Sequence, residues 1–80
     1  MMEKIDEDVL KAIRVMQMAK RAARIFPEGI SKMEVYEHLV AGGQKISFRI
    51  LDGVYDRLKA GGTVRVYPTM HDVRAVIKDL

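Results

Sequence analysis

The chain contains no cysteine and no tryptophan, and only two of its 80 residues are proline. Without cysteine it can form neither a disulfide framework nor a thiolate metal site, which is compatible with a reducing compartment. No apolar run approaches the roughly 20 residues that a membrane-spanning helix needs. The N-terminal segment MMEKIDEDV is too acidic and polar for a signal peptide. We therefore expect a cytoplasmic protein that does not enter a membrane.

Residues that could perform catalysis or hold a metal are also scarce. The two histidines, His38 and His71, have no second histidine or carboxylate at the spacing of a metal site. The glycine pairs at 42–43 and 61–62 follow predicted helices, whereas a phosphate-binding loop follows a strand and opens a helix. We therefore expect neither enzyme activity nor a metal or cofactor.

The length and composition indicate one folded domain. Eighty residues are enough for a single modest core, and an apolar fraction of 49% with 31% charged residues excludes a disordered chain. No linker, repeat or low-complexity segment interrupts the sequence, so residues 1–80 are predicted to form a single domain. The net charge of +3 is a small excess, which is compatible with nucleic-acid binding but equally common in proteins that bind none.

The first part of the chain predicts a long helix over residues 6–25. Asp6 is expected to cap its N-terminus, and Pro27 ends it by removing a backbone donor. One side of the helix is apolar and is predicted to face the core; it comprises Val9, Ala12, Ile13, Met16, Ala19, Ala23 and Phe26.

The opposite side of this helix is mainly polar and basic. It comprises Lys11, Arg14, Gln17, Arg21 and Arg24. It is either a basic stripe that lies along a phosphate backbone or an acidic partner, or simply a solvated helix face. Met18 and Ile25 interrupt it, either as scattered surface residues or as part of a dimer contact.

The remainder predicts two shorter helices and a hairpin. Ser31 and Glu34 form a capping box at the start of a helix over 32–40, after a turn at 27–30 that can include a short strand. A third helix over 47–60 has Ser47 as its cap and glycines at its end, and its predicted core side comprises Ile50, Leu51, Val54, Tyr55 and Leu58. Residues 63–67 and 73–77 alternate apolar and polar side chains, as paired strands do.

Three helices followed by a two-stranded hairpin resemble the winged helix-turn-helix family over nearly the whole chain. The segment ISFRILDGVYDRLKAGGTVRV is similar to the family's pattern of apolar pairs along the recognition helix, a leucine near its end, a small residue with glycine, and a β-branched strand. The resemblance implies an α+β fold, a three-helix winged helix-turn-helix with a C-terminal two-stranded β-hairpin wing. No single subfamily is matched.

The resemblance also implies a function. In DNA-binding members of the family, the third helix enters the major groove and the wing contacts the neighbouring backbone. This chain is thus expected to be a small DNA-binding transcription regulator, associated with the nucleoid, for which a homodimer is plausible. The implied DNA contacts are Lys45, Ser47, Phe48, Arg49, Asp52, Gly53 and Asp56 on the helix, Thr69, Met70 and His71 at the wing tip, and Arg65 and Arg74 beside it. Arg14, Arg21 and Arg24 would add backbone contacts.

Two features of the third helix depart from a strong DNA binder. Asp52 and Asp56 leave its predicted outward side close to neutral, whereas phosphate neutralisation supplies much of the affinity for DNA. An alternative is therefore a winged-helix protein-interaction module that binds no DNA. Gly53 in mid-helix costs about 1 kcal/mol relative to alanine. Either a base or backbone passes close to it, or it packs beneath a neighbouring side chain.

Overall fold

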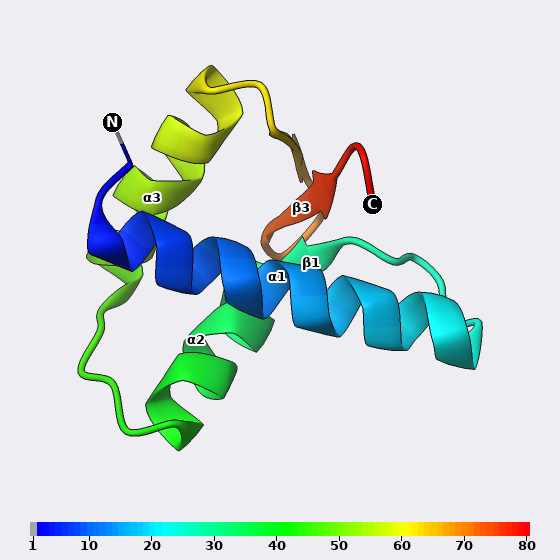
Figure 1. The fold of residues 1–80 in the computed structure, drawn as a ribbon, viewed down its shortest axis with the longest axis horizontal. Coiled ribbons are helices and arrows are strands. Elements are labelled where there is room, and N and C mark those ends of the chain that lie inside the picture. The colour runs from blue at the N-terminus through cyan, green and yellow to red at the C-terminus, as the bar shows by residue number, and fades with distance from the viewer. Residues whose placement is uncertain (1) are drawn as a thin grey trace.

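The computed structural model describes residues 2–80, and these form three helices and a three-stranded antiparallel sheet (Figure 1). The elements follow in the order α1 (Lys4–Ala23), β1 (Ile30–Ser31), α2 (Lys32–Ala41), α3 (Phe48–Ala60), β2 (Val64–Pro68) and β3 (Val73–Ile77). The predicted α+β class is confirmed. No helix within residues 2–80 is long and apolar enough to cross a membrane.

The sheet has one strand more than the predicted hairpin. β2 and β3 form that hairpin, with Val64 opposite Ile77 and Pro68 opposite Val73. The short β1 pairs with the other edge of β3, where Ile30 lies opposite Ala75. The strand order is therefore β1–β3–β2, and the last strand of the chain lies in the centre of the sheet.

One cluster of buried apolar side chains joins all six elements. It comprises Val9, Ala12, Ile13, Ile30, Val35, Leu39, Leu51, Val54, Tyr55, Leu58, Val64, Ala75 and Ile77. Helix periodicity predicted most of its helical members, but Ile50 is 45% exposed and lies outside it. Ala19, Ala23 and Phe26 are exposed as well, because the C-terminal end of α1 and the residues after it extend past the rest of the molecule (Figure 1).

The predicted ends of α2 and α3 are confirmed in atomic detail. The Ser31 hydroxyl accepts the Glu34 amide at 3.1 Å, and the Glu34 carboxylate accepts the Ser31 amide at 3.1 Å, which completes the capping box. Ser47 caps α3 by accepting the Ile50 amide at 3.2 Å. At the other end of α3, Gly62 has φ +78°, a left-handed conformation that glycine adopts without strain.

The predicted N-cap of α1 is wrong. The helix begins at Lys4, and Glu3 at the cap position makes no side-chain hydrogen bond to the backbone. Asp6 lies within the first turn and is buried. Its carboxylate accepts hydrogen bonds from the Arg57 guanidinium at 2.7 and 2.9 Å, so it joins α1 to α3 instead of capping a helix.

Gln17 is also placed differently from the prediction. The sequence put it on the solvent side of α1, but it is fully buried. Its side-chain oxygen accepts the Ile77 amide at 2.8 Å and its side-chain nitrogen donates to the Ile77 carbonyl at 3.2 Å. These bonds are needed because β1 begins at Ile30, opposite Ala75, and therefore leaves no strand to pair with Ile77 on that edge of β3. The amide of Gln17 thus replaces a missing strand.

Candidate functional site

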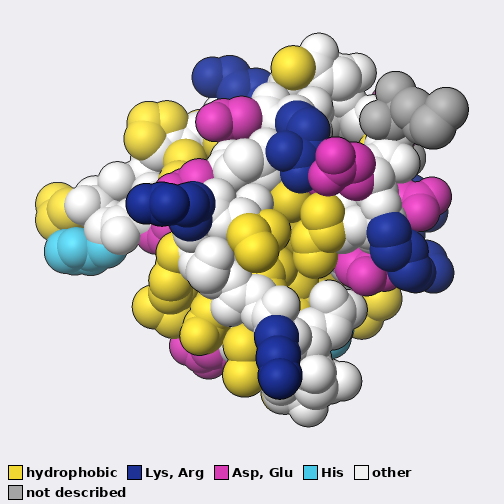
Figure 2. Space-filling view, turned by 90° about the vertical axis from the view of Figure 1, so that its left-hand side faces the viewer, with side chains coloured by type: hydrophobic (Ala, Val, Ile, Leu, Met, Phe, Trp, Pro, Cys, Tyr) yellow, Lys and Arg dark blue, Asp and Glu magenta, His cyan; other side chains and the backbone are white. Residues whose placement is uncertain are grey.

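The side of α3 that faces away from the core is open to solvent. Leu51, Val54, Tyr55 and Leu58 fill the core side. We call the opposite side the α3 outer face; it comprises Arg49, Asp52, Gly53 and Asp56. The three charged members are exposed, as the periodicity predicted. Figure 2 shows one side of the molecule on which hydrophobic side chains gather in the middle, with lysine or arginine side chains above and below them.

The charge of the α3 outer face differs from the predicted near-neutral balance. The Lys32 ammonium, at the start of α2, forms an ion pair with the Asp52 carboxylate. Asp52 is therefore compensated by a cation from another helix. Sequence analysis missed Lys32, because no local pattern indicates a pair 20 residues apart.

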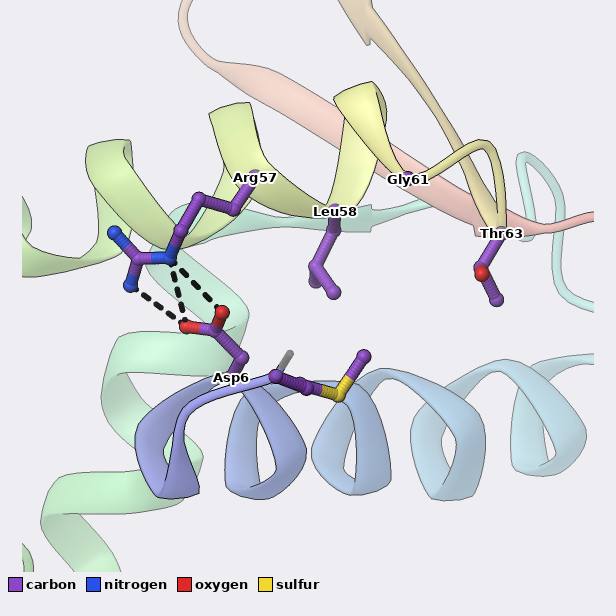
Figure 3. A pocket seen from close by; sticks show the side chains of 6 residues that line it. Asp6, Arg57, Leu58, Gly61 and Thr63 are labelled. Atoms are coloured by element: carbon purple, nitrogen blue, oxygen red, sulfur yellow. Dashed lines mark hydrogen bonds and ion pairs between the residues drawn. The ribbon is translucent and has the colours of Figure 1, made fainter.

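The remaining cations divide into engaged and free ones. Arg57 turns away from the α3 outer face to Asp6 (Figure 3). Within residues 2–80, no ion pair involves Lys45, Arg49 or Lys59. These three free cations lie on or beside the α3 outer face and leave Asp56 as its uncompensated acid. The exposed charge is therefore positive.

A groove runs between the start of α1 and α3. It has a volume of about 550 Å³ and is lined by Glu3, Ile5, Lys45, Ile46, Arg49, Ile50, Gly53 and Arg57. A Cβ atom added at Gly53 would meet only the flexible end of Arg57, with the Nη1 atom at 3.4 Å. Packing within the chain therefore does not require glycine here. The backbone at Gly53 is accessible from the groove.

The tip of the β2–β3 hairpin is a fixed turn close to α2. The Thr69 amide donates to the Asp72 carbonyl at 2.7 Å, and the Thr69 hydroxyl accepts the Asp72 amide at 3.2 Å. The Asp72 carboxylate accepts the Met33 amide at 3.0 Å, which ties the turn to α2. Met70 and His71 are exposed at this tip. On β2, the exposed Arg65 guanidinium lies 5.7 Å from the centre of the Tyr67 ring.

Two of the arginines that were predicted to contact DNA form hydrogen bonds or ion pairs with other groups of their own chain. Arg74 donates to the Gly29 carbonyl at 2.7 Å and lies 3.5 Å from the Glu34 carboxylate. Arg21 forms an ion pair with Glu28 at 2.6 Å, and it also donates to the backbone carbonyl of residue 80. Both guanidinium groups point to their own chain, so the structure does not bring them to the α3 outer face.

The other assigned residues divide between α3 and α1. Phe48 stacks on Tyr36 with ring centres 4.5 Å apart, and Ser47 and Lys45 lie at the same end of α3. Arg14 is exposed on α1, and Arg24 follows the last residue of α1 in a left-handed conformation with φ 56°. Arg14 thus lies on α1 and Arg24 directly after it, and neither belongs to the α3 outer face.

The pKa of Asp6 follows from its contact with α3. Hydrogen bonds from Arg57 hold the pKa of the Asp6 carboxyl below its ordinary range, although burial of the carboxyl opposes this. Because the pKa is lower in the folded than in the unfolded chain, the contact stabilises the fold above about pH 4. This stabilisation is lost as the pH falls through the folded-state pKa.

Removing the partner of Asp6 should therefore have a pH-dependent effect. We expect Arg57→Met to unfold at a lower urea concentration than the wild type near pH 7, because the Asp6 carboxylate stays buried without its cation. The difference should narrow at about pH 3, where Asp6 in the variant is protonated. Equal differences at both pH values would show that the charge of Asp6 does not contribute.

No family model matches this chain, and neither a curated protein nor a solved structure does so. Within the described residues, no three histidine, cysteine, aspartate or glutamate side chains are placed to hold a metal ion. The geometry and charge of the α3 outer face, the groove beside it and the hairpin tip are therefore the basis of the functional interpretation.

Proposed function

We propose that this chain is a winged helix-turn-helix protein that binds double-stranded DNA as a transcription regulator. In this proposal α3 reads the major groove and the β2–β3 hairpin is the wing. The observation that supports it most is the α3 outer face, which makes no core contacts and has three free cations on or beside it. The order of the elements, with α2 and α3 before a hairpin, agrees with the same interpretation.

The exposed charge of the α3 outer face is more positive than the sequence alone indicated, and this supports DNA as the ligand. Phosphate neutralisation by lysine and arginine supplies the part of the affinity that is independent of base sequence. With Asp52 paired to Lys32, the cations Lys45, Arg49 and Lys59 are opposed only by Asp56. In this proposal the exposed Arg65 and His71 on the hairpin contact the neighbouring backbone, as a wing does.

The individual roles follow from the chemistry of each residue. Arg49 would read a guanine edge with two parallel hydrogen bonds. The hydroxyl of Ser47 accepts from the Ile50 amide, which leaves its own hydrogen free to donate to a phosphate beside the start of α3. Gly53 gives a sugar or phosphate room to approach the helix backbone. Arg74 and Arg21 are not included, because both bond within the fold.

The base-reading role of Arg49 can be measured directly. Replacing Arg49 with alanine should weaken binding to a selected duplex by about 1–3 kcal/mol and relax the preference at one base pair. Fluorescence anisotropy with a duplex selected from a random pool gives the affinity. Lys78→Ala removes an exposed cation beyond β3 and is the matched control. Unchanged affinity for Arg49→Ala would exclude this residue from the interface.

DNA binding itself can be tested by NMR titration of the labelled protein with a mixed-sequence duplex at low and moderate salt. We expect chemical-shift changes at residues 45–56 and 68–72. The binding constant obtained from them should fall with salt concentration, with a log–log slope of about −0.9 for each phosphate contacted. Shifts confined to residues 11–24 would keep DNA as the ligand but overturn the role of α3. Absence of shifts at low salt would overturn DNA binding.

A protein-interaction module is the second candidate. It is favoured by Ile50, which is 45% exposed where it lines the groove between α1 and α3. Contacts of this kind bury apolar area and respond little to salt. A partner whose binding is insensitive to salt and lost in Ile50→Asp, with no DNA binding in the titration above, would support this candidate over the first.

A further inference from the structure

The groove between the start of α1 and α3 has an apolar floor. Ile5 and Ile46 are half-buried there and pack against the core, and Ile50 beside them is 45% exposed. The start of α1, the loop before α3 and α3 itself lie on one side of the molecule (Figure 1). The groove volume of about 550 Å³ falls within the range of about 300–1,000 Å³ that is typical of small-molecule sites.

Gly53 keeps the middle of this groove free of a side chain. Arg49, Gly53 and Arg57 are spaced four residues apart, so they follow one another along one side of α3, and all three line the groove. A Cβ atom at Gly53 would meet only the Arg57 Nη1 atom, at 3.4 Å. A longer side chain at this position would therefore extend into the groove and occupy it.

The two ends of the groove differ in charge. Towards the end of α3, Arg57 is engaged by Asp6 through hydrogen bonds of 2.7 and 2.9 Å, and its guanidinium lies 3.6 Å from the Glu3 carboxylate. Towards the start of α3, Arg49 and Lys45 are exposed, and no ion pair within residues 2–80 involves either of them. The free positive charge of the groove is therefore gathered at one end of the apolar floor.

We propose that this groove binds a small carboxylic acid with an apolar body. The body lies on the isoleucine floor against the backbone of Gly53, and the carboxylate is held by Arg49 and Lys45. A guanidinium and a carboxylate can form two parallel, charge-assisted hydrogen bonds, so the acid complements the charged end as well as the floor. A phosphorylated sugar or a nucleotide has a polar body, which an isoleucine floor does not match.

Binding of the acid does not depend on the proposed function, but its effect on DNA does. Lys45 and Arg49 are two of the residues assigned to DNA, so an acid held by both covers cations that a phosphate or a base would contact. The acid and DNA should therefore exclude each other, and by linkage each should weaken the binding of the other. The acid would act as an effector that releases the protein from DNA.

Three probes separate the contributions of the apolar body and the carboxylate: octanoate has both, 1-octanol has only the body, and acetate has only the carboxylate. In NMR titrations of the labelled protein at constant ionic strength, we expect octanoate to cause saturable chemical-shift changes at Ile5, Ile46, Arg49, Ile50 and Gly53. 1-Octanol should bind about tenfold more weakly or worse, and acetate should not saturate. Equal affinity for octanoate and 1-octanol, or no saturable change with octanoate, would overturn the proposal.

Two variants test the site itself. Gly53→Leu should fill the groove and lower the affinity for octanoate about tenfold or more, and urea unfolding checks that it folds, as we expect because leucine favours a helix more than glycine does. Arg49→Ala should weaken octanoate but not 1-octanol. Lys78→Ala removes an exposed cation outside the groove and should change neither. A folded Gly53→Leu or Arg49→Ala variant that binds octanoate as the wild type does would overturn the proposal.

The effect on DNA is measured by fluorescence anisotropy with a duplex selected from a random pool. Octanoate should displace the wild type from the duplex, and acetate at the same ionic strength should not. Simultaneous binding of octanoate and DNA would overturn the exclusion. Binding of octanoate by a protein that binds no DNA would overturn the proposed function and leave the acid site standing.

Discussion

Replacing Gln17 with alanine is expected to lower the free energy of unfolding by about 3–5 kcal/mol, a large part of the stability of an 80-residue domain. The loss has two sources. The Ile77 amide and carbonyl lose the partners that they have at 2.8 and 3.2 Å, and no strand is available to replace them. The truncated side chain also leaves a cavity between α1 and β3.

Two comparisons separate these sources. Gln17→Met keeps the length of the side chain but removes both hydrogen bonds. Because it leaves little cavity, its loss in free energy of unfolding measures the contribution of the two bonds. Gln44→Ala removes a half-buried glutamine whose single bond, to Asp8, is 3.4 Å long, and we expect it to cost less than about 1 kcal/mol. Urea unfolding gives all three values. A Gln17→Met variant as stable as the wild type would show that the two bonds contribute no net stability.

Leu58→Ala should have the second large effect, a loss of about 2–5 kcal/mol in the free energy of unfolding. Leu58 is 3% exposed, and its side chain points from α3 towards α1, beside the Asp6–Arg57 contact (Figure 3). Removing it takes away apolar contacts that hold these two helices together, and the space cannot be refilled without moving one of them. Thermal or urea unfolding monitored by circular dichroism measures the loss.

Ile50→Ala is the matched control on the same helix. Sequence periodicity assigned both residues to the core, but Ile50 is 45% exposed and we expect its truncation to change stability by less than about 1 kcal/mol. If Leu58→Ala and Ile50→Ala were equally mild, the orientation of α3 described above would be wrong. If both were severe, Ile50 would be buried by a contact such as a partner chain.

The fold was predictable where its causes are local. Caps such as Ser31 with Glu34 depend on residues three apart, and the core side of α3 depends on a period of 3.6 residues. Gln17 and Asp6 were misplaced because their partners, Ile77 and Arg57, lie 60 and 51 residues away. A polar residue on a helix is usually exposed, and only the tertiary arrangement provides the partners that allow it to be buried.

The candidate site shows the same division. Periodicity correctly placed Arg49 and Asp52 on the exposed side of α3, but it could not show that Lys32 compensates Asp52. Alternation along β3 predicted that Arg74 lies on the outer side of the hairpin. In the structure the Arg74 guanidinium instead donates to the Gly29 carbonyl, in the turn before β1. The charge available to a ligand therefore depends on which cations the fold itself engages, which a linear pattern does not reveal.

The central position of β3 has a consequence for how the chain folds during its synthesis. Residues 73–77 leave the ribosome after all three helices and both outer strands have been made. Until then β1 and β2 have no strand to pair with, and the Gln17 amide has no backbone partner. The helices can associate early, but the sheet can form only when the last element emerges. A ribosome stalled before residue 73 should therefore display a helical, protease-sensitive chain.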